Sequence, residues 1–270
     1  KLFAKDDGAY TYGNVPDVDL NKAILDYKKV FAQYKESTKH IPLRTETFQK
    51  FRKETAKVVS YMVKEFELRK NADQMKRASI AKTGELNMNK VFSYKFNDDI
   101  FKKMTIVPNG KSHGLVMFLD WSGSMSGHLE NTLKQLITLI MFCKKVNIPF
   151  EVYSFIEESG DKRKYFFQTP KMGDLQFNKF VLANILSSRM NSRELTYAYG
   201  AIFKMSGFGG KRALQPYWLR MSGTPLNETI IAAMEIVPEF QRKHKLQFVN
   251  TVFLTDGEGH KLPYYYDMDY

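Results

Sequence analysis

Residues 115–124 read Leu-Val-Met-Phe-Leu-Asp-Trp-Ser-Gly-Ser, an apolar run followed at once by a polar turn. A continuous apolar run of this length, without polar alternation, is typical of a strand that is buried on both faces of a parallel sheet. The run ends at Asp120, where the carboxyl end of such a strand turns. We therefore predict a central strand over 115–119 and look for functional residues in the turn that follows it.

The segments after this strand alternate between helix and strand patterns. We predict helices over 128–146, 174–190 and 225–237, strands over 150–156 and 247–255, and a further edge strand over 164–168. Residues 191–223 contain a loop-rich stretch that includes 206–211. Strands that alternate with helices indicate an α/β fold. The expected architecture is a doubly wound, mostly parallel sheet with helices on both faces, preceded by an α-helical extension.

The segments before this strand form that extension. Apolar residues at three- and four-residue steps predict one helix from Asp17 to Ser37 and another from about Thr45 to Lys70. We divide the chain into a helical basic extension (1–81), a connector with short extended pieces (82–113) and the α/β domain (114–270). A fold of this kind normally continues with another helix and strand after Asp256, so we expect the domain to be truncated at its C-terminal end.

Composition and charge restrict the function classes. Of 270 residues, 41 are Lys or Arg and 29 are Asp or Glu, a net charge of +12. Residues 1–113 carry 23 basic and 14 acidic residues, so the excess lies mainly in the extension and connector. It indicates either nucleic-acid binding or a lysine-rich solvated helix surface. No apolar run approaches the roughly 20 residues of a membrane span.

The single cysteine, Cys143, excludes an intrachain disulfide and a cysteine-based zinc site. It favours a reducing compartment, and we expect a cytoplasmic protein. Cys143 itself has apolar neighbours on a predicted helix and is interpreted as a core residue.

Three polar loops are predicted at the carboxyl edge of the sheet. They are the turn at 120–124, Ser222-Gly223-Thr224-Pro225, and Thr255-Asp256-Gly257. Their oxygen ligands suit a hard divalent cation, Mg²⁺ or Mn²⁺. The candidate metal ligands are Asp120, Ser122, Ser124, Thr224 and Asp256. Two carboxylates leave such an ion under-neutralised, so a carboxylate from a partner could complete the site. The alternative is an N-capping aspartate with incidental loop serines.

Other chemistry-bearing residues support no catalytic centre, and we predict none. The glycine-rich stretch 206–211 lacks the P-loop pattern, and His128 and His260 belong to no H-E-x-x-H motif. Trp121 is expected to pack over the loop, with an exposed anchor for a partner as the alternative.

The set Asp120-x-Ser122-x-Ser124, Thr224 and Asp256 resembles the metal-ion-dependent adhesion site of von Willebrand factor A domains, whose sheet is Rossmann-like. The resemblance implies direct metal coordination by Ser122 and Ser124. It also implies that Thr224 binds directly or through water, and that Asp120 and Asp256 bind largely through water.

A closer resemblance covers roughly residues 67–260. The stretches Thr83-Gly84-Glu85-Leu86-Asn87, Leu119–Met125 and Phe150–Phe155 are similar to the carboxyl-terminal part of cobaltochelatase CobT-type subunits and to CobT-like proteins of tailed bacteriophages. The resemblance implies an adaptor that works with an AAA+ ATPase of the MoxR/chelatase kind and is not catalytic alone. The acidic segment typical of the bacterial subunit is absent. The alternatives are a subunit of an ATP-dependent cobalt chelatase in cobalamin biosynthesis and a basic, nucleic-acid-associated phage protein.

Overall fold

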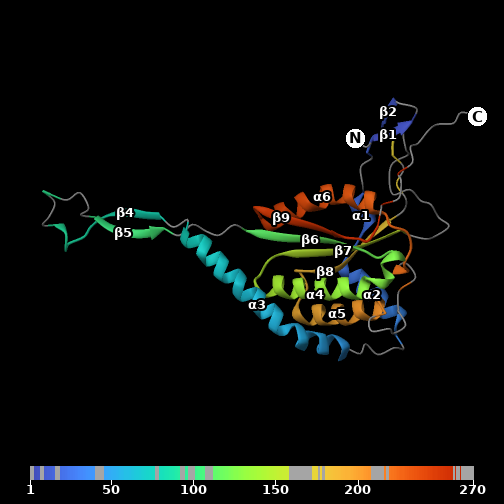
Figure 1. Cartoon of the computed structure of the whole chain (residues 1–270), viewed down its shortest axis with the longest axis horizontal. Helices are drawn as coiled ribbons and strands as arrows, with labels where there is room; N and C mark the ends of the chain where they lie inside the picture. Colours follow the sequence, from blue (N-terminus) through green and yellow to red (C-terminus); the bar gives the residue numbers. More distant parts are fainter. Residues whose placement is uncertain are drawn as a thin grey trace, which may run out of the picture.

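The computed structural model in Figure 1 describes most of the chain. The described residues are 3–6, 9–15, 19–39, 46–76, 79–91, 95–96, 101–106, 112–157, 172–175, 177, 180–207, 216, 219–257, 259 and 262.

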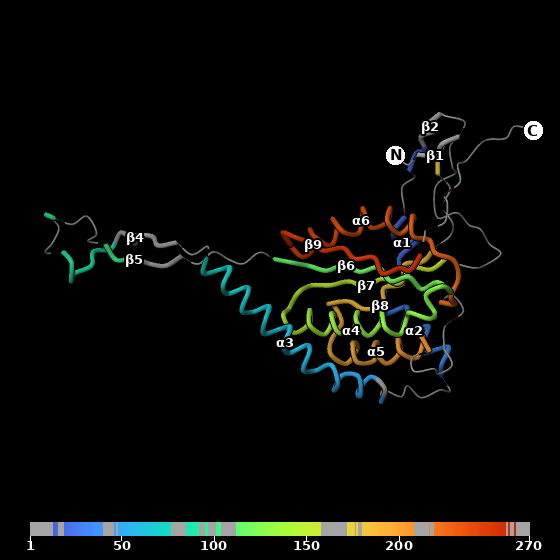
Figure 2. Tube along the Cα trace, viewed as in Figure 1, coloured from blue at the N-terminus to red at the C-terminus, as the bar shows by residue number. Residues whose placement is uncertain are grey.

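A five-stranded sheet forms the centre of the molecule, with strand order β3-β8-β7-β6-β9. Its strands are β3 (Ile24–Leu25), β6 (His113–Asp120), β7 (Phe150–Glu157), β8 (Phe180–Ser187) and β9 (Phe248–Leu254). Strand β6 is parallel to both β7 and β9, and β3 is parallel to β8, whereas β7 and β8 are antiparallel. Figure 2 shows β6 and β9 side by side although they are far apart in sequence. The predicted α/β class with a mostly parallel sheet is confirmed.

Helices cover both faces of this sheet (Figure 1). One face packs against α4 (Leu129–Lys145) and α5 (Ser192–Met205), and the other packs against α1 (Leu20–Ala23) and α6 (Leu226–His244). Strand β6 is buried from Gly114 to Asp120 because it has neighbouring strands on both sides and helices on both faces. The apolar run from which we predicted a central strand therefore reflects its position in the middle of the sheet.

Two helices of the segment predicted as an extension pack on the same core. Helix α2 (Tyr27–Ser37) buries Tyr27, Val30 and Tyr34 in the cluster that includes α4 and α5. Helix α3 (Glu46–Lys76) contacts that layer through aromatic pairs. These are Phe48 with Tyr199 at 4.8 Å, Phe51 with Phe203 at 5.6 Å and Phe66 with Phe142 at 5.5 Å between ring centroids.

Two short hairpins lie outside the central sheet. Strands β1 (Phe3–Asp6) and β2 (Ala9–Tyr12) form one, and β4 (Ser79–Leu86) and β5 (Phe101–Ile106) form the other. Strand β5 and most of β4 fall in the predicted connector, and this hairpin lies beyond the end of α3, away from the sheet (Figure 1). Within the described residues, none of the helices combines the length and apolar character needed to span a bilayer.

The prediction of a helix over 174–190 is wrong, because Phe180–Ser187 form β8. Seven of these eight residues are buried, so the segment lacks the polar alternation that marks a half-buried strand. Within 191–223 we predicted a loop-rich stretch and no helix, whereas Ser192–Met205 form α5. A capping box between Asn191 and Glu194 begins this helix and was a readable signal.

The remaining boundaries differ in smaller ways. The predicted helix 17–37 is interrupted by β3, because Ile24 and Leu25 pair with Leu182 and Ala183 at the sheet edge. Helix α3 runs six residues beyond Lys70, and α6 continues through Pro238 to His244. The predicted edge strand 164–168 lies outside the described residues.

Candidate metal centre

Two aspartates come together at the carboxyl edge of the sheet because β6 and β9 run parallel. The register pairs Leu119 with Leu254, so the ends of the two strands lie side by side. Asp120 is the last residue of β6, and Asp256 follows β9. Thr255 donates a hydrogen bond from its Oγ1 to Oδ2 of Asp120 at 2.7 Å, which joins the two strand ends directly.

The turn after β6 connects these aspartates through two serines. The Ser122 backbone N–H donates to Oδ1 of Asp120 at 2.8 Å, so the carboxylate fixes the start of the turn. The hydroxyls of Ser122 and Ser124 are hydrogen-bonded at 2.9 Å, and Ser124 Oγ donates to Oδ1 of Asp256 at 3.0 Å. Four of the five predicted ligands thus lie in one connected group, which we call the carboxyl-edge cluster: Asp120, Ser122, Ser124 and Asp256.

The fifth predicted ligand, Thr224, lies in a loop that packs against the same turn. Ser222 forms a parallel β-bridge with Ser122, and the Gly123 N–H donates to the Ser222 carbonyl at 3.3 Å. Thr224 follows two residues later and is buried. Its carbonyl accepts a hydrogen bond from the N–H of Leu226, in the first turn of α6. The helix that covers one sheet face therefore holds this loop at the carboxyl edge.

Exposure changes sharply across the carboxyl-edge cluster. Asp120 is 0% exposed and Ser122 is 2% exposed, whereas Ser124 and Asp256 are exposed to solvent. A fully buried carboxylate needs hydrogen bonds and a compensating charge. The Ser122 N–H and the Thr255 hydroxyl supply hydrogen bonds, but no Lys, Arg or His in the described part of the chain forms an ion pair with Asp120. The cluster therefore fits a bound cation, reached from the Ser124 side.

The chemistry of the donors narrows the class of cation. Every side-chain atom of the carboxyl-edge cluster that could bind a metal is a carboxylate or hydroxyl oxygen. Mg²⁺ and Mn²⁺ bind such oxygen ligands in proteins. Among the described residues there is no group of three or more His, Cys, Asp or Glu side chains that could hold a metal. A candidate site in this part of the molecule depends on hydroxyl groups as well as carboxylates.

Trp121 lies between the two ends of the turn but points into the core. It is 0% exposed and packs in the α4 and α5 cluster, so the alternative of an exposed partner anchor is wrong. Its indole Nε1–H has no hydrogen-bond partner among the described residues. The side chain thus anchors the turn through apolar packing alone.

Cys143 is buried on α4, as predicted for a core residue. Burial raises the pKa of its thiol to about 12, so very little thiolate exists near neutral pH. We expect iodoacetamide at pH 8 to alkylate the folded chain more slowly than the urea-unfolded chain by about a hundredfold or more. Mass spectrometry of timed samples measures the two rates, and equal rates would contradict this assignment.

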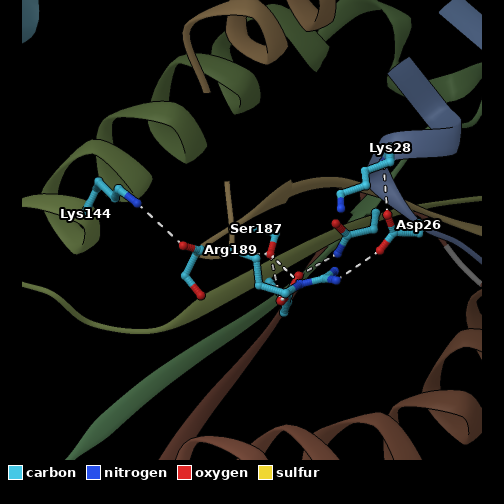
Figure 3. Close-up of polar contacts among 8 residues, drawn as sticks. Asp26, Lys28, Lys144, Ser187 and Arg189 are labelled. Atoms are coloured by element: carbon cyan, nitrogen blue, oxygen red, sulfur yellow. Dashed lines mark hydrogen bonds and ion pairs between the residues drawn. The ribbon is translucent and has the colours of Figure 1, made fainter. Parts of the chain in front are cut away.

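A second polar group, which the sequence analysis missed, lies where β7 begins and β8 ends, and Figure 3 shows its contacts around Arg189. Glu151, the second residue of β7, is 5% exposed. Its Oε2 accepts from Asn184 Nδ2 at 2.7 Å, and its Oε1 accepts from Ser187 Oγ at 2.8 Å and from Arg189 Nε at 3.2 Å. A charged residue inside the mostly apolar run 150–156 was the available signal.

Arg189 links this group to the N-terminal segment. Its Nη1 donates to Oδ2 of Asp26 at 3.0 Å (Figure 3). Its guanidinium also lies 5.1 Å from the ring centroid of Tyr27. Burial alone would lower the pKa of Arg189, but the attraction of Glu151 and Asp26 outweighs it and raises that pKa. We interpret the group as a structural link that holds the start of α2 against the end of β8.

We expect Arg189→Ala to lower the free energy of unfolding by about 2 kcal/mol, because it leaves the buried Glu151 without its cation. Urea unfolding followed by circular dichroism measures this loss. Arg193→Ala is the matched control, since Arg193 is an exposed arginine in the first turn of α5. Equal effects of the two substitutions would show that Arg189 contributes nothing specific.

The fold and site together define an α/β protein with a mostly parallel sheet and a polar cluster at its carboxyl edge. Comparison of the chain with protein-family models, with curated proteins and with solved structures finds no significant match in any of the three.

Proposed function

We propose that this chain is a divalent-metal-dependent protein-interaction subunit, with a von Willebrand A-type domain of the CobT-like kind. In this proposal it works as an adaptor for an AAA+ ATPase of the MoxR/chelatase type in the cytoplasm. The observation that carries the proposal is the carboxyl-edge cluster, in which a buried carboxylate is linked through two serine hydroxyls to a solvent-exposed carboxylate. The buried carboxylate can hold the cation, and the exposed side of the cluster leaves the cation accessible to a group of the partner protein.

Each residue of the site has a distinct part in this proposal. Ser122 and Ser124 would hold Mg²⁺ or Mn²⁺ directly, and Thr224 would hold it directly or through water. Asp120 and Asp256 would act largely through water, with Thr255 and the Ser122 N–H fixing the Asp120 carboxylate. The bound cation supplies a positive centre that attracts a carboxylate of the partner. The protein contributes the hydroxyls and carboxylates that fix this centre at the exposed edge.

The test is capture of the ATPase under controlled metal conditions. The tagged chain is mixed with the MoxR-type ATPase encoded in the same genome, in Mg²⁺ or in EDTA. We expect capture in Mg²⁺, loss in EDTA, and loss with Ser122→Ala. Ser126→Ala should behave as the wild type, because Ser126 is an exposed serine of the same turn. Capture that persists in EDTA, or no capture in Mg²⁺, would contradict the adaptor role.

A further inference from the structure

Helix α3 carries a row of large apolar side chains on its exposed surface. Val58, Tyr61, Leu68 and Met75 are each between 53% and 66% exposed. The same helix packs against the core through other positions, including Phe51, Val59 and Phe66. Single exposed apolar residues are ordinary on a protein surface, but four of them aligned along one helix call for an explanation. We call these four residues the α3 row.

The spacing of the α3 row matches that of the residues that pack between two paired helices, a line of contact that we call the seam. Tyr61, Leu68 and Met75 recur every seven residues, and Val58 precedes Tyr61 by three. Ala72 and Glu65 occupy the positions equivalent to Val58 in the later repeats. Apolar residues at these alternating three- and four-residue steps are buried when a second helix lies alongside. From residue 58 to residue 75 the row extends about 26 Å, long enough for several turns of a partner helix.

Four of the six positions that flank the α3 row are basic, and the other two are Met62 and Asn71. Lys57 and Lys64 lie on one side, and Arg69 and Lys76 lie on the other. All four are exposed, and none forms an ion pair with the described part of the chain. In paired helices the residues at these flanking positions select the partner, because they face the flanking positions of the other helix.

This charge pattern disfavours a second copy of the chain as the occupant. In a parallel pair, Lys64 of one copy would face Arg69 of the other. In an antiparallel pair, each basic side would face itself. Both arrangements place like charges together along the seam, which is destabilising. A helix with Asp or Glu at its flanking positions would instead find a complementary charge at the four basic positions.

We propose that the α3 row is a docking surface for an amphipathic helix of a partner protein, with apolar residues at its seam and acidic residues beside them. Glu65 lies within the row and would require a basic or polar residue opposite it, which fixes the register of the partner. The α3 row belongs to a different element from the carboxyl-edge cluster. The two surfaces therefore bind separate partner segments, and the docking of the helix does not depend on metal.

The probe is a synthetic three-heptad peptide with Leu at the seam positions and Glu at the flanking positions. Mutual repulsion of the Glu residues keeps this peptide from pairing with itself. Fluorescence anisotropy with the full chain at about 0.15 M salt should show binding, at least about tenfold tighter than to the same peptide with Lys at the flanks. Leu68→Glu should weaken the binding at least about tenfold. Met234→Glu should leave it unchanged, since Met234 is an exposed methionine on α6.

Three outcomes would overturn the proposal. The first is no binding of the acidic peptide, or equal loss with Leu68→Glu and Met234→Glu. The second is a dimer in sedimentation that Leu68→Glu dissociates, which would assign the α3 row to a second copy. The third is duplex DNA binding that is lost with Lys64→Ala but kept with Leu68→Glu, together with no preference for the acidic peptide. That result would assign the basic flanks to nucleic acid. All three substituted residues, Leu68, Met234 and Lys64, are exposed, so circular dichroism should be unchanged in every variant.

Discussion

Replacing Asp120 by Asn is expected to lower the affinity of the chain for Mg²⁺ by about 10- to 100-fold. This is the usual effect of losing a residue that does not bind the metal directly but orients the residues that do. The substitution keeps the shape of the side chain but removes the buried negative charge. It also leaves one of two donors, the Ser122 N–H or the Thr255 hydroxyl, without its acceptor. The loss of charge weakens attraction for the cation, and the lost hydrogen bond loosens the turn that carries Ser122 and Ser124.

Thermal unfolding measures this effect without a partner protein. A ligand at 100 times its dissociation constant stabilises the folded state by about 2.7 kcal/mol, so Mg²⁺ should raise the Tm of the wild type clearly. The same concentration should raise the Tm of Asp120→Asn much less. Ser126→Ala, in the same turn, should respond as the wild type does. An equal Mg²⁺-dependent rise in Asp120→Asn would show that Asp120 does not support a metal.

Replacing Trp121 by Ala is expected to cost about 3–5 kcal/mol of the free energy of unfolding. The side chain is fully buried among the residues of the α4 and α5 cluster, so its removal leaves a large cavity. A protein of ordinary stability, about 5–15 kcal/mol, would lose a large share of it. Because Trp121 follows Asp120 directly, the same cavity should also loosen the turn. Urea unfolding followed by circular dichroism gives the value.

Two further variants make the Trp121 prediction specific. Trp121→Phe should cost much less, because the indole N–H donates no hydrogen bond within the described residues and most of the apolar volume remains. Phe96→Ala should cost almost nothing, since Phe96 is 93% exposed. If Trp121→Ala is no more destabilising than Phe96→Ala, then the side chain is not part of the core.

The parts of the fold that the sequence predicts correctly are those with local signals. The strand before Asp120 is a continuous apolar run with a sharp end. Strand β9, before Asp256, contains Asn250 and Thr251 but is otherwise made of valine, phenylalanine and leucine, which still indicates a strand. Parallel pairing then brings the two ends together. Helix α5 also had a local signal in its capping box at Asn191, and our prediction missed it. Strand β8 had none, because burial on both faces removes the alternation that separates a strand from a buried helix.

The contacts that could not be predicted from the sequence depend on how strands that are distant in the sequence are aligned with one another. Thr255 reaches Asp120 only because Leu254 pairs with Leu119. Glu151 meets Ser187 because β7 and β8 run antiparallel in one particular alignment. A shift of one residue would turn these side chains to the other face of the sheet. The types of residue in the candidate site were therefore predictable, but their hydrogen bonds were not.

Direct binding of Mn²⁺ tests the central claim that the carboxyl-edge cluster is a metal site. Electron paramagnetic resonance of free Mn²⁺, titrated with the full chain, gives the number of sites and their affinity. We expect one Mn²⁺ per chain, displaced by Mg²⁺, with the site lost in Ser122→Ala and kept in Ser126→Ala. No bound Mn²⁺, or Mn²⁺ bound equally well by Ser122→Ala, would contradict the account.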